Sequence, residues 1–220
     1  MNSTVLPSHQ ATAAKRGLLG SVVPNSRAHW TLMVLGLAGS FAFDATWFIA
    51  GLVRTGYDPL VQPISALSLG PGGWVQMANF VVFGTIGIVT AFAWRPTLAG
   101  GLGATWYPRI SVLAGAALIC AAIFSQDPGH GFPVGALTPA HPSWHAQIHN
   151  IVSYISLIAT IAQLLILARR MHREARWHGW APAAVLAAVL MMTFLAIFGV
   201  LVANGGPAGL FEKLASTAPA

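Results

Sequence analysis

The chain has 220 residues, of which 55% are hydrophobic and only 7% are charged, with a formal net charge of +6 at pH 7. Soluble globular domains carry about 25% charged residues, which they need to cover their surface. The composition therefore excludes an ordinary soluble domain. The lysines and arginines of a membrane protein help to set its orientation in the bilayer. The positive net charge is therefore not taken as a sign of nucleic-acid binding. We expect an all-α integral membrane protein whose main partner is the lipid bilayer.

The first 27 residues are mostly polar or small and lack the apolar core of a signal peptide. We expect residues 1–27 to form a disordered cytoplasmic tail, followed by a first span that serves as an uncleaved anchor. Cys120 is the single cysteine and lies inside an apolar run. No disulfide can therefore form within the chain.

Five apolar runs follow, and each is about long enough to cross a hydrocarbon layer of about 30 Å as a helix. Helices are expected because every backbone amide in a bilayer must be satisfied within its own segment. The predicted bundle covers residues 28–204, with transmembrane helices at about 30–53, 74–94, 109–125, 148–168 and 181–203. We expect a short extracytoplasmic tail over residues 205–220.

The basic residues are unevenly distributed among the loops. Nine of the eleven lysines and arginines fall in the amino-terminal tail and in the loops after the second and fourth spans, and only Arg54 and Lys213 fall on the other side. The positive-inside rule predicts a cytoplasmic amino terminus in the cell membrane, with loops 54–73 and 126–147 outside. The basic run at 168–178 fits the same rule, and a specific anionic-lipid site is the alternative there.

The two outer loops resemble each other. Residues 58–74 read DPLVQPISALSLGPGGW and residues 127–144 read DPGHGFPVGALTPAHPSW, so both begin with Asp-Pro and end with Trp. We infer a parallel repeat in which spans one and two correspond to spans three and four. A chance similarity between loops rich in proline and alanine is the alternative. A repeat predicts that the two loops lie side by side around an outer vestibule.

Four of the eight histidines lie in the second outer loop and at the start of the fourth span. His145 and His149 are four residues apart and share one helical face, which His141 extends if the helix starts early. This spacing suits two nitrogen ligands of zinc, with Asp127 and His130 as further ligands nearby. Histidines that bind lipid headgroups, and an aspartate that caps backbone amides, are the alternatives.

Asp44 lies about nine residues before the outer end of the first span, roughly 14 Å deep at about 1.5 Å per residue. An ionisable group at that depth usually faces the bundle interior and marks a functional site. A protonated carboxyl that joins two helices by a hydrogen bond is the alternative. We expect Asp44 or Asp58 to act as a base or to orient a metal ligand, and Ser65 to hydrogen-bond a substrate carbonyl. A turn cap is the alternative for Asp58.

Two stretches carry a resemblance to a known family: GYDPLVQPISALSLGPGGWVQMANFVVFG at residues 56–84 and DPGHGFPVGALTPAHPSWHAQIHN at residues 127–150. They resemble the family catalogued as domain of unknown function 998, over roughly residues 30–210. The resemblance implies a small polytopic bacterial membrane protein, often with six spans. A sixth span is therefore incomplete or missing here, or the carboxyl terminus has diverged.

A more distant likeness, by analogy alone, is to alkaline ceramidases and adiponectin-receptor-like proteins. Those proteins hold zinc in a helical bundle with a serine, an aspartate and histidines, and Ser65, Asp127, His145 and His149 are the same residue types. The sharpest functional prediction is a zinc-dependent hydrolase of a lipid or amphiphile, in which the metal lowers the pKa of a bound water. The alternative is a non-enzymatic accessory protein that binds a lipid, a quinone or a partner helix.

Overall fold

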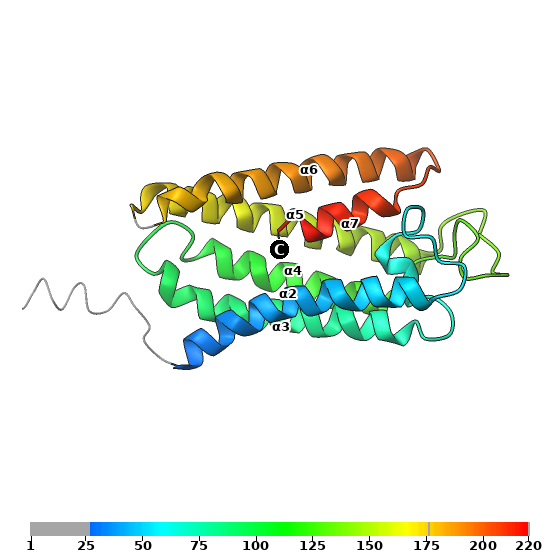
Figure 1. Ribbon diagram of the computed structural model, residues 1–220, viewed down its shortest axis with the longest axis horizontal. Helices are drawn as coiled ribbons and strands as arrows, with labels where there is room; N and C mark the ends of the chain where they lie inside the picture. Colours follow the sequence, from blue (N-terminus) through cyan, green and yellow to red (C-terminus); the bar gives the residue numbers. More distant parts are fainter. Residues whose placement is uncertain (1–26, 176, 220) are drawn as a thin grey trace, which may run out of the picture.

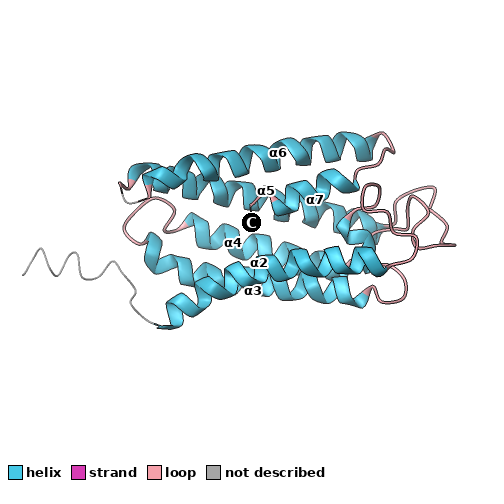
Figure 2. Cartoon of the chain, in the orientation of Figure 1, coloured by secondary structure: helices cyan, strands magenta, loops and turns pink. Residues whose placement is uncertain are grey.

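The computed structural model describes residues 27–175 and 177–219, so the tail expected over residues 1–27 lies almost wholly outside the described residues. Five long helices run roughly side by side (Figure 1): α2 (Arg27–Val53), α3 (Trp74–Leu98), α4 (Trp106–Ile123), α5 (Trp144–Arg173) and α6 (Ala181–Ala203). A shorter helix, α7 (Gly209–Thr217), and two 3-10 turns, η1 (Ile64–Ser68) and η2 (His178–Trp180), complete the described elements. Figure 2 shows helices and loops but no strand over these ranges, which confirms the all-α prediction.

Five helices are long and apolar enough to cross a membrane, as predicted. Their outward faces carry many exposed apolar side chains, among them Leu52 and Val53, of the kind that contact lipid. The fourth span begins at Trp144, four residues earlier than expected. Its start is set by Ser143, whose side-chain oxygen accepts a hydrogen bond of 3.1 Å from the backbone N–H of Ala146.

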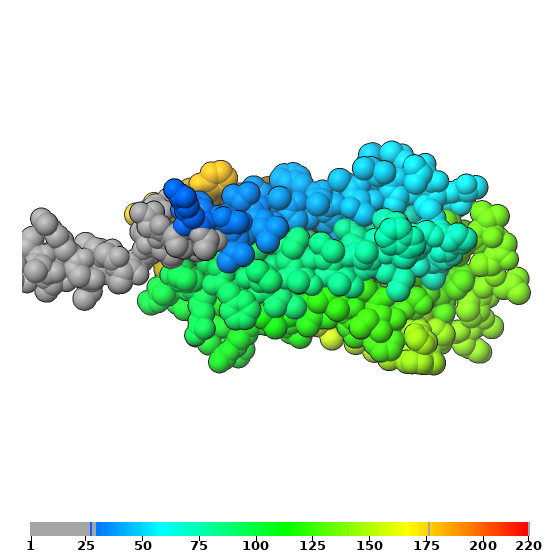
Figure 3. Space-filling model, turned by 90° about the horizontal axis from the view of Figure 1, so that it is seen from below, coloured from blue at the N-terminus to red at the C-terminus, as the bar shows by residue number. Residues whose placement is uncertain are grey.

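Helices that follow one another in the chain pack against one another, from α2 on α3 to α5 on α6. Figure 3 shows α2, α3 and α4 along one face of the molecule. The α3–α4 crossing is close because Gly84 meets Gly115. A Cβ atom on Gly84 would lie 2.6 Å from the Gly115 carbonyl oxygen. Small residues at such crossings let helix backbones approach, which is how helices associate when lipid is as apolar as the protein interior.

Loops 54–73 and 124–143 lie at the same end of the bundle, which we call the loop end (Figure 1). The Gln62 side-chain amide donates to the His130 carbonyl at 2.9 Å, and the rings of Tyr57 and Phe132 meet with centroids 5.4 Å apart. The expected side-by-side arrangement of the two loops is therefore confirmed. The internal repeat that suggested it stays a prediction.

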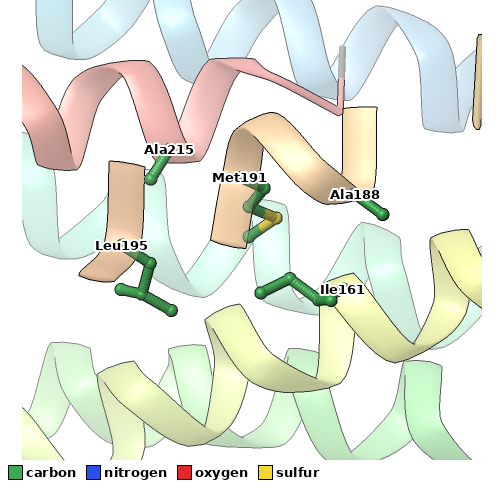
Figure 4. Close-up of a cluster of buried hydrophobic side chains, with 5 residues drawn as sticks. All are labelled: Ile161, Ala188, Met191, Leu195 and Ala215. Atoms are coloured by element: carbon green, nitrogen blue, oxygen red, sulfur yellow. The ribbon is translucent and has the colours of Figure 1, made fainter. Parts of the chain in front are cut away.

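The carboxyl-terminal segment differs from the expected tail, because residues 209–217 form α7 and fold back along α6 (Figure 1). Figure 4 shows Ala215 of α7 beside Met191 of α6, in a buried cluster that also contains Ile161 of α5. Nine residues are too few to cross a bilayer. This helix is therefore held in place by packing against α5 and α6, because it is too short to be held by spanning the bilayer.

Two backbone hydrogen bonds fasten the start of α7 to the first outer loop. The Gly209 N–H donates to the Val61 carbonyl at 3.0 Å, and the Leu210 N–H donates to the Leu60 carbonyl at 3.2 Å. A Cβ atom on Gly209 would lie 2.2 Å from the Gln62 carbonyl oxygen, so glycine is required at this contact. The end of the chain thereby becomes part of the loop end.

Candidate functional site

A pocket of about 300 Å³ lies at the loop end, between the two loops and helices α5, α6 and α7. Its wall contains both polar and apolar side chains. The polar residues include Ser65, Asp127, His130, His149 and Glu212, and the apolar residues include Leu157, Phe198 and Val202. The fold therefore gathers residues from five separate segments around one cavity.

Four of the eight predicted site residues line this pocket: Ser65, Asp127, His130 and His149. Ser65 lies in η1, whose five residues are all buried. The Ser65 hydroxyl donates a hydrogen bond of 2.6 Å to the side-chain oxygen of Gln126. This bond joins the first loop to the second.

His149 is buried, with 1% of its surface exposed. Its Nδ1 lies 2.9 Å from the carbonyl oxygen of Ala121 and 2.7 Å from that of Phe124. These carbonyls belong to the last turn of α4, where a helix leaves its final carbonyls without partners inside the helix. His149 therefore caps α4 through Nδ1, while its Nε2 has no hydrogen-bond partner among the residues that the structure describes.

Asp127 and His130 reach the pocket through the second loop. Asp127 Oδ2 accepts a hydrogen bond of 2.7 Å from the Ser143 N–H, so this carboxylate ties the loop to the start of α5. His130 takes a left-handed backbone conformation, with φ 51°, and its carbonyl is held by Gln62. The capping role that we considered for Asp127 is thus present, and it coexists with a place in the pocket wall.

The predicted aspartates outside the pocket serve local structure. Asp44 Oδ1 accepts a hydrogen bond of 2.9 Å from the indole N–H of Trp47, one turn along the same helix. Asp58 Oδ1 accepts one of 2.9 Å from the Leu60 N–H, as a turn cap does. Neither residue lines the pocket, so the structure does not bring Asp44 or Asp58 together with the other predicted site residues.

The predicted stripe of three histidines does not form. His141 is exposed and precedes α5, which begins only at Trp144. His145 is on the helix, but its ring packs against Trp144, with centroids 3.8 Å apart, and against Phe124 at 5.6 Å. Among the described residues, no group of three histidine, cysteine or acidic side chains is placed to hold a metal ion. Zinc binding stays a prediction from the sequence.

Sequence reasoning missed Glu212 and Lys213, which lie in the middle of α7. Glu212 Oε2 accepts a hydrogen bond from the Ile64 N–H. Burial raises the pKa of Glu212 to about 7, against the lowering effects of Lys213 and of that N–H group. The sequence holds only five acidic residues, so the presence of one in this segment was a usable signal.

Lys213 is buried and is not among the residues that line the pocket. Its Nζ donates to the carbonyls of Gln62 at 2.8 Å and Gly209 at 3.2 Å, and it lies 5.2 Å from the centroid of the Tyr57 ring. Burial lowers the pKa of Lys213 to about 8, against the raising effects of Glu212 and Asp58. This lysine therefore serves to fasten α7 to the first outer loop.

Comparison with known proteins adds the family and nothing on activity. No curated protein and no solved structure matches the chain. The sequence profile of one family, described as "Protein of unknown function (DUF998)", matches residues 37–219. This range runs from the first span to the end of α7 and includes the whole pocket. The chain therefore belongs to the DUF998 family of membrane proteins, as the two loop sequences had suggested.

Proposed function

We propose that this membrane protein binds a single-chain amphiphile in the pocket at its loop end. The observation that carries the proposal is the mixed lining of the pocket, in which polar side chains come from the loops, α5 and α7, and Leu157, Phe198 and Val202 of α5 and α6 add an apolar part. A ligand with a polar headgroup and one apolar chain matches this lining. Ligand sites are usually apolar cavities with a few convergent polar groups, as this one is.

The depth and size of the pocket support the same ligand class. Leu157 lies 13 residues after Trp144 in α5, which is about 20 Å along the helix axis. The wall therefore extends from the loops into the transmembrane part of the bundle. A volume of about 300 Å³ is at the lower end of the range of about 300–1,000 Å³ for small-molecule sites. It suits one alkyl chain better than a phospholipid with two.

The proposal favours the binding function over the zinc-dependent hydrolase. Binding uses the pocket wall as it stands, whereas hydrolysis needs a set of metal ligands that the described residues do not bring together. Metal analysis of the purified protein tests the hydrolase prediction directly.

Photolabelling tests the proposal. The protein is placed in phosphatidylcholine nanodiscs with a long-chain alcohol that carries a diazirine in its chain, and labelled peptides are located by mass spectrometry. We expect labelling of α5 and α6 beside the pocket. Ser153 lines the pocket, so Ser153→Phe should block this labelling. Ile151 is 60% exposed on the same helix, so Ile151→Phe is the matched control. Equal labelling of Ser153→Phe and Ile151→Phe would contradict the proposal.

We further propose that the loop end faces the outside of the cell membrane. Among the described residues, only two cations lie at that end, and both are used by the fold: Lys213 through the bonds to Gln62 and Gly209, and Arg54 through bonds to the carbonyls of Leu67 and Leu69. The other described arginines lie toward the opposite end, as the positive-inside rule requires of a cytoplasmic face. In a Cys120→Ala background, Leu137→Cys should react with an impermeant thiol reagent on intact cells. If that cysteine does not react on intact cells, the loop end faces the cytoplasm and the proposed orientation is wrong.

A further inference from the structure

A second cavity, a groove of about 650 Å³, lies between α5 and α6 at the end of the bundle opposite the loop end (Figure 1). Arg169 and His172 line it from the last two turns of α5, and Val185 and Val189 line it from the first turns of α6. His178, in the 3-10 turn η2 between the two helices, also lines it. The groove therefore has a basic end and continues into an apolar part.

Three basic side chains gather at the basic end. Arg169 and His172 are three residues apart on α5, a spacing that places Cβ atoms about 5–6 Å apart on a helix surface. The ring centroids of His172 and His178 are 4.9 Å apart. All three side chains are exposed, and none has a hydrogen bond or an ion pair with another residue that the structure describes. Their N–H groups are therefore available to an anion, since a guanidinium and an imidazole both donate.

No acidic side chain among the described lining residues balances this charge. Glu174 is the acidic residue nearest in the sequence, and its carboxylate is paired with Arg170. The guanidinium of Arg170 occupies the space beside Gly101, in the connection between α3 and α4, and Arg170 does not line the groove. Arg170 thus takes up the charge of Glu174, and Arg169 keeps its own for a ligand.

The apolar part of the groove lies within two helices that are long and apolar enough to cross a membrane. Leu165 is 43% exposed, Val185 45% and Leu186 58%. Exposed apolar side chains of a spanning helix face the hydrocarbon chains of the bilayer. Val189 lies eight residues after Ala181, which is about 12 Å along the helix axis. The groove therefore reaches far enough to hold the first part of an acyl chain.

We infer that this groove binds an anionic phospholipid, with its phosphate on Arg169, His172 and His178 and one acyl chain along Val185 and Leu186. Arginine suits the phosphate because its planar guanidinium can bond two phosphate oxygens at once. A free anion would use only the basic end, and an apolar helix only the other part. A phospholipid matches both parts in one molecule. The site goes beyond the proposed function, because it lies at the other end of the bundle from the pocket.

Native mass spectrometry in a neutral detergent tests the headgroup, because it counts the lipids bound to the intact protein. Dioleoylphosphatidylglycerol and dioleoylphosphatidylcholine have the same chains, but the choline ammonium neutralises the phosphate charge. On the wild-type protein we expect the first phosphatidylglycerol to bind about fivefold more tightly than the first phosphatidylcholine, the effect of one arginine near an anionic lipid. Equal affinities would overturn the inference. This comparison needs no variant, so it holds even if a substitution disturbs folding.

A pair of arginine variants separates a specific site from general attraction. Arg169 and Arg173 are both exposed near the end of α5, but only Arg169 lines the groove. We expect Arg169→Gln to weaken the binding of the first phosphatidylglycerol about fivefold. Arg173→Gln removes the same charge and should leave that affinity unchanged. If both variants weaken binding equally, the lipid responds to the net charge of this end and the inference is overturned.

A pair of valine variants tests the place of the acyl chain. Val185→Trp puts a large side chain into the groove and should weaken phosphatidylglycerol binding. Val200 is 62% exposed on the same helix and lines neither cavity, so Val200→Trp is the matched control and should have no effect. Unchanged binding in Val185→Trp would show that no chain occupies the groove, which contradicts the inference. Photolabelling of the pocket at the loop end is a separate measurement, so the proposed function can stand or fail independently.

Discussion

Gly209→Ala should detach α7 from the loop end. The new Cβ atom would lie 2.2 Å from the Gln62 carbonyl oxygen and 2.9 Å from that of Pro59. Both obstacles are backbone atoms, so no side-chain rotation relieves the contact and the start of α7 must move. The movement breaks the bonds from Gly209 to Val61 and from Leu210 to Leu60. At about 1 kcal/mol net for each hydrogen bond, docking of α7 weakens by about 2 kcal/mol.

This loss corresponds to a roughly thirtyfold change in the ratio of docked to detached α7. Amide hydrogen exchange followed by mass spectrometry measures it, because exchange in peptides 209–218 accelerates as the detached fraction grows. Gly206→Ala is the matched control in the same connection, since a Cβ atom there meets its nearest neighbours at 3.4 Å, an ordinary contact. Equal exchange in Gly209→Ala and Gly206→Ala would refute the docking that the structure shows.

Three further predictions concern packing, pH and metal. Met191 is 1% exposed and Met192 is 41% exposed. Met191→Ala should lower the free energy of unfolding, measured by detergent titration, by about 2 kcal/mol. This value is near the low end for such changes because lipid replaces water in the reference state. Met192→Ala should have little effect, and equal losses would contradict the packing in Figure 4. Burial raises the pKa of Glu212 to about 7, so the Glu212 side chain gains its negative charge as the pH rises through 7. Octyltrimethylammonium, a cationic single-chain amphiphile, should therefore bind more tightly at pH 8 than at pH 6. If the same increase in affinity occurs in Glu212→Gln, Glu212 is not its cause. Zinc-dependent hydrolysis predicts one zinc per chain in the purified wild-type protein and its loss in His149→Ala, whereas a folded wild-type protein without zinc rules that function out.

The five spans were predictable because each one satisfies the bilayer by itself. A run of about twenty apolar residues must be helical wherever it packs, so Trp74 and Ala203 could be recognised as span ends without knowledge of the neighbouring helices. The approach of the two outer loops could also be inferred, from their shared Asp-Pro starts. In both cases the evidence lies within a continuous stretch of sequence.

The candidate site was only half predictable, because its members are defined by partners far away in the chain. His149 was chosen for its spacing from His145, but its chemistry is set by carbonyls that lie 25 and 28 residues earlier. His149 therefore caps α4, whereas His145 packs against Trp144 and Phe124. Helical periodicity places residues on a face, and it does not say which atoms the face meets.

The sequence by itself determined the class of the protein, its membrane spans and the end of the bundle at which polar residues gather. Tertiary structure decided the place of α7 and, with it, the site. Glu212 joins the pocket only because a nine-residue helix, too short to be held by the bilayer, docks through Gly209 on the first outer loop and through Ala215 on α6. The contacts with the first outer loop join segments about 150 residues apart. Neither the length of an apolar run nor its periodicity indicates contacts between residues that far apart in the sequence.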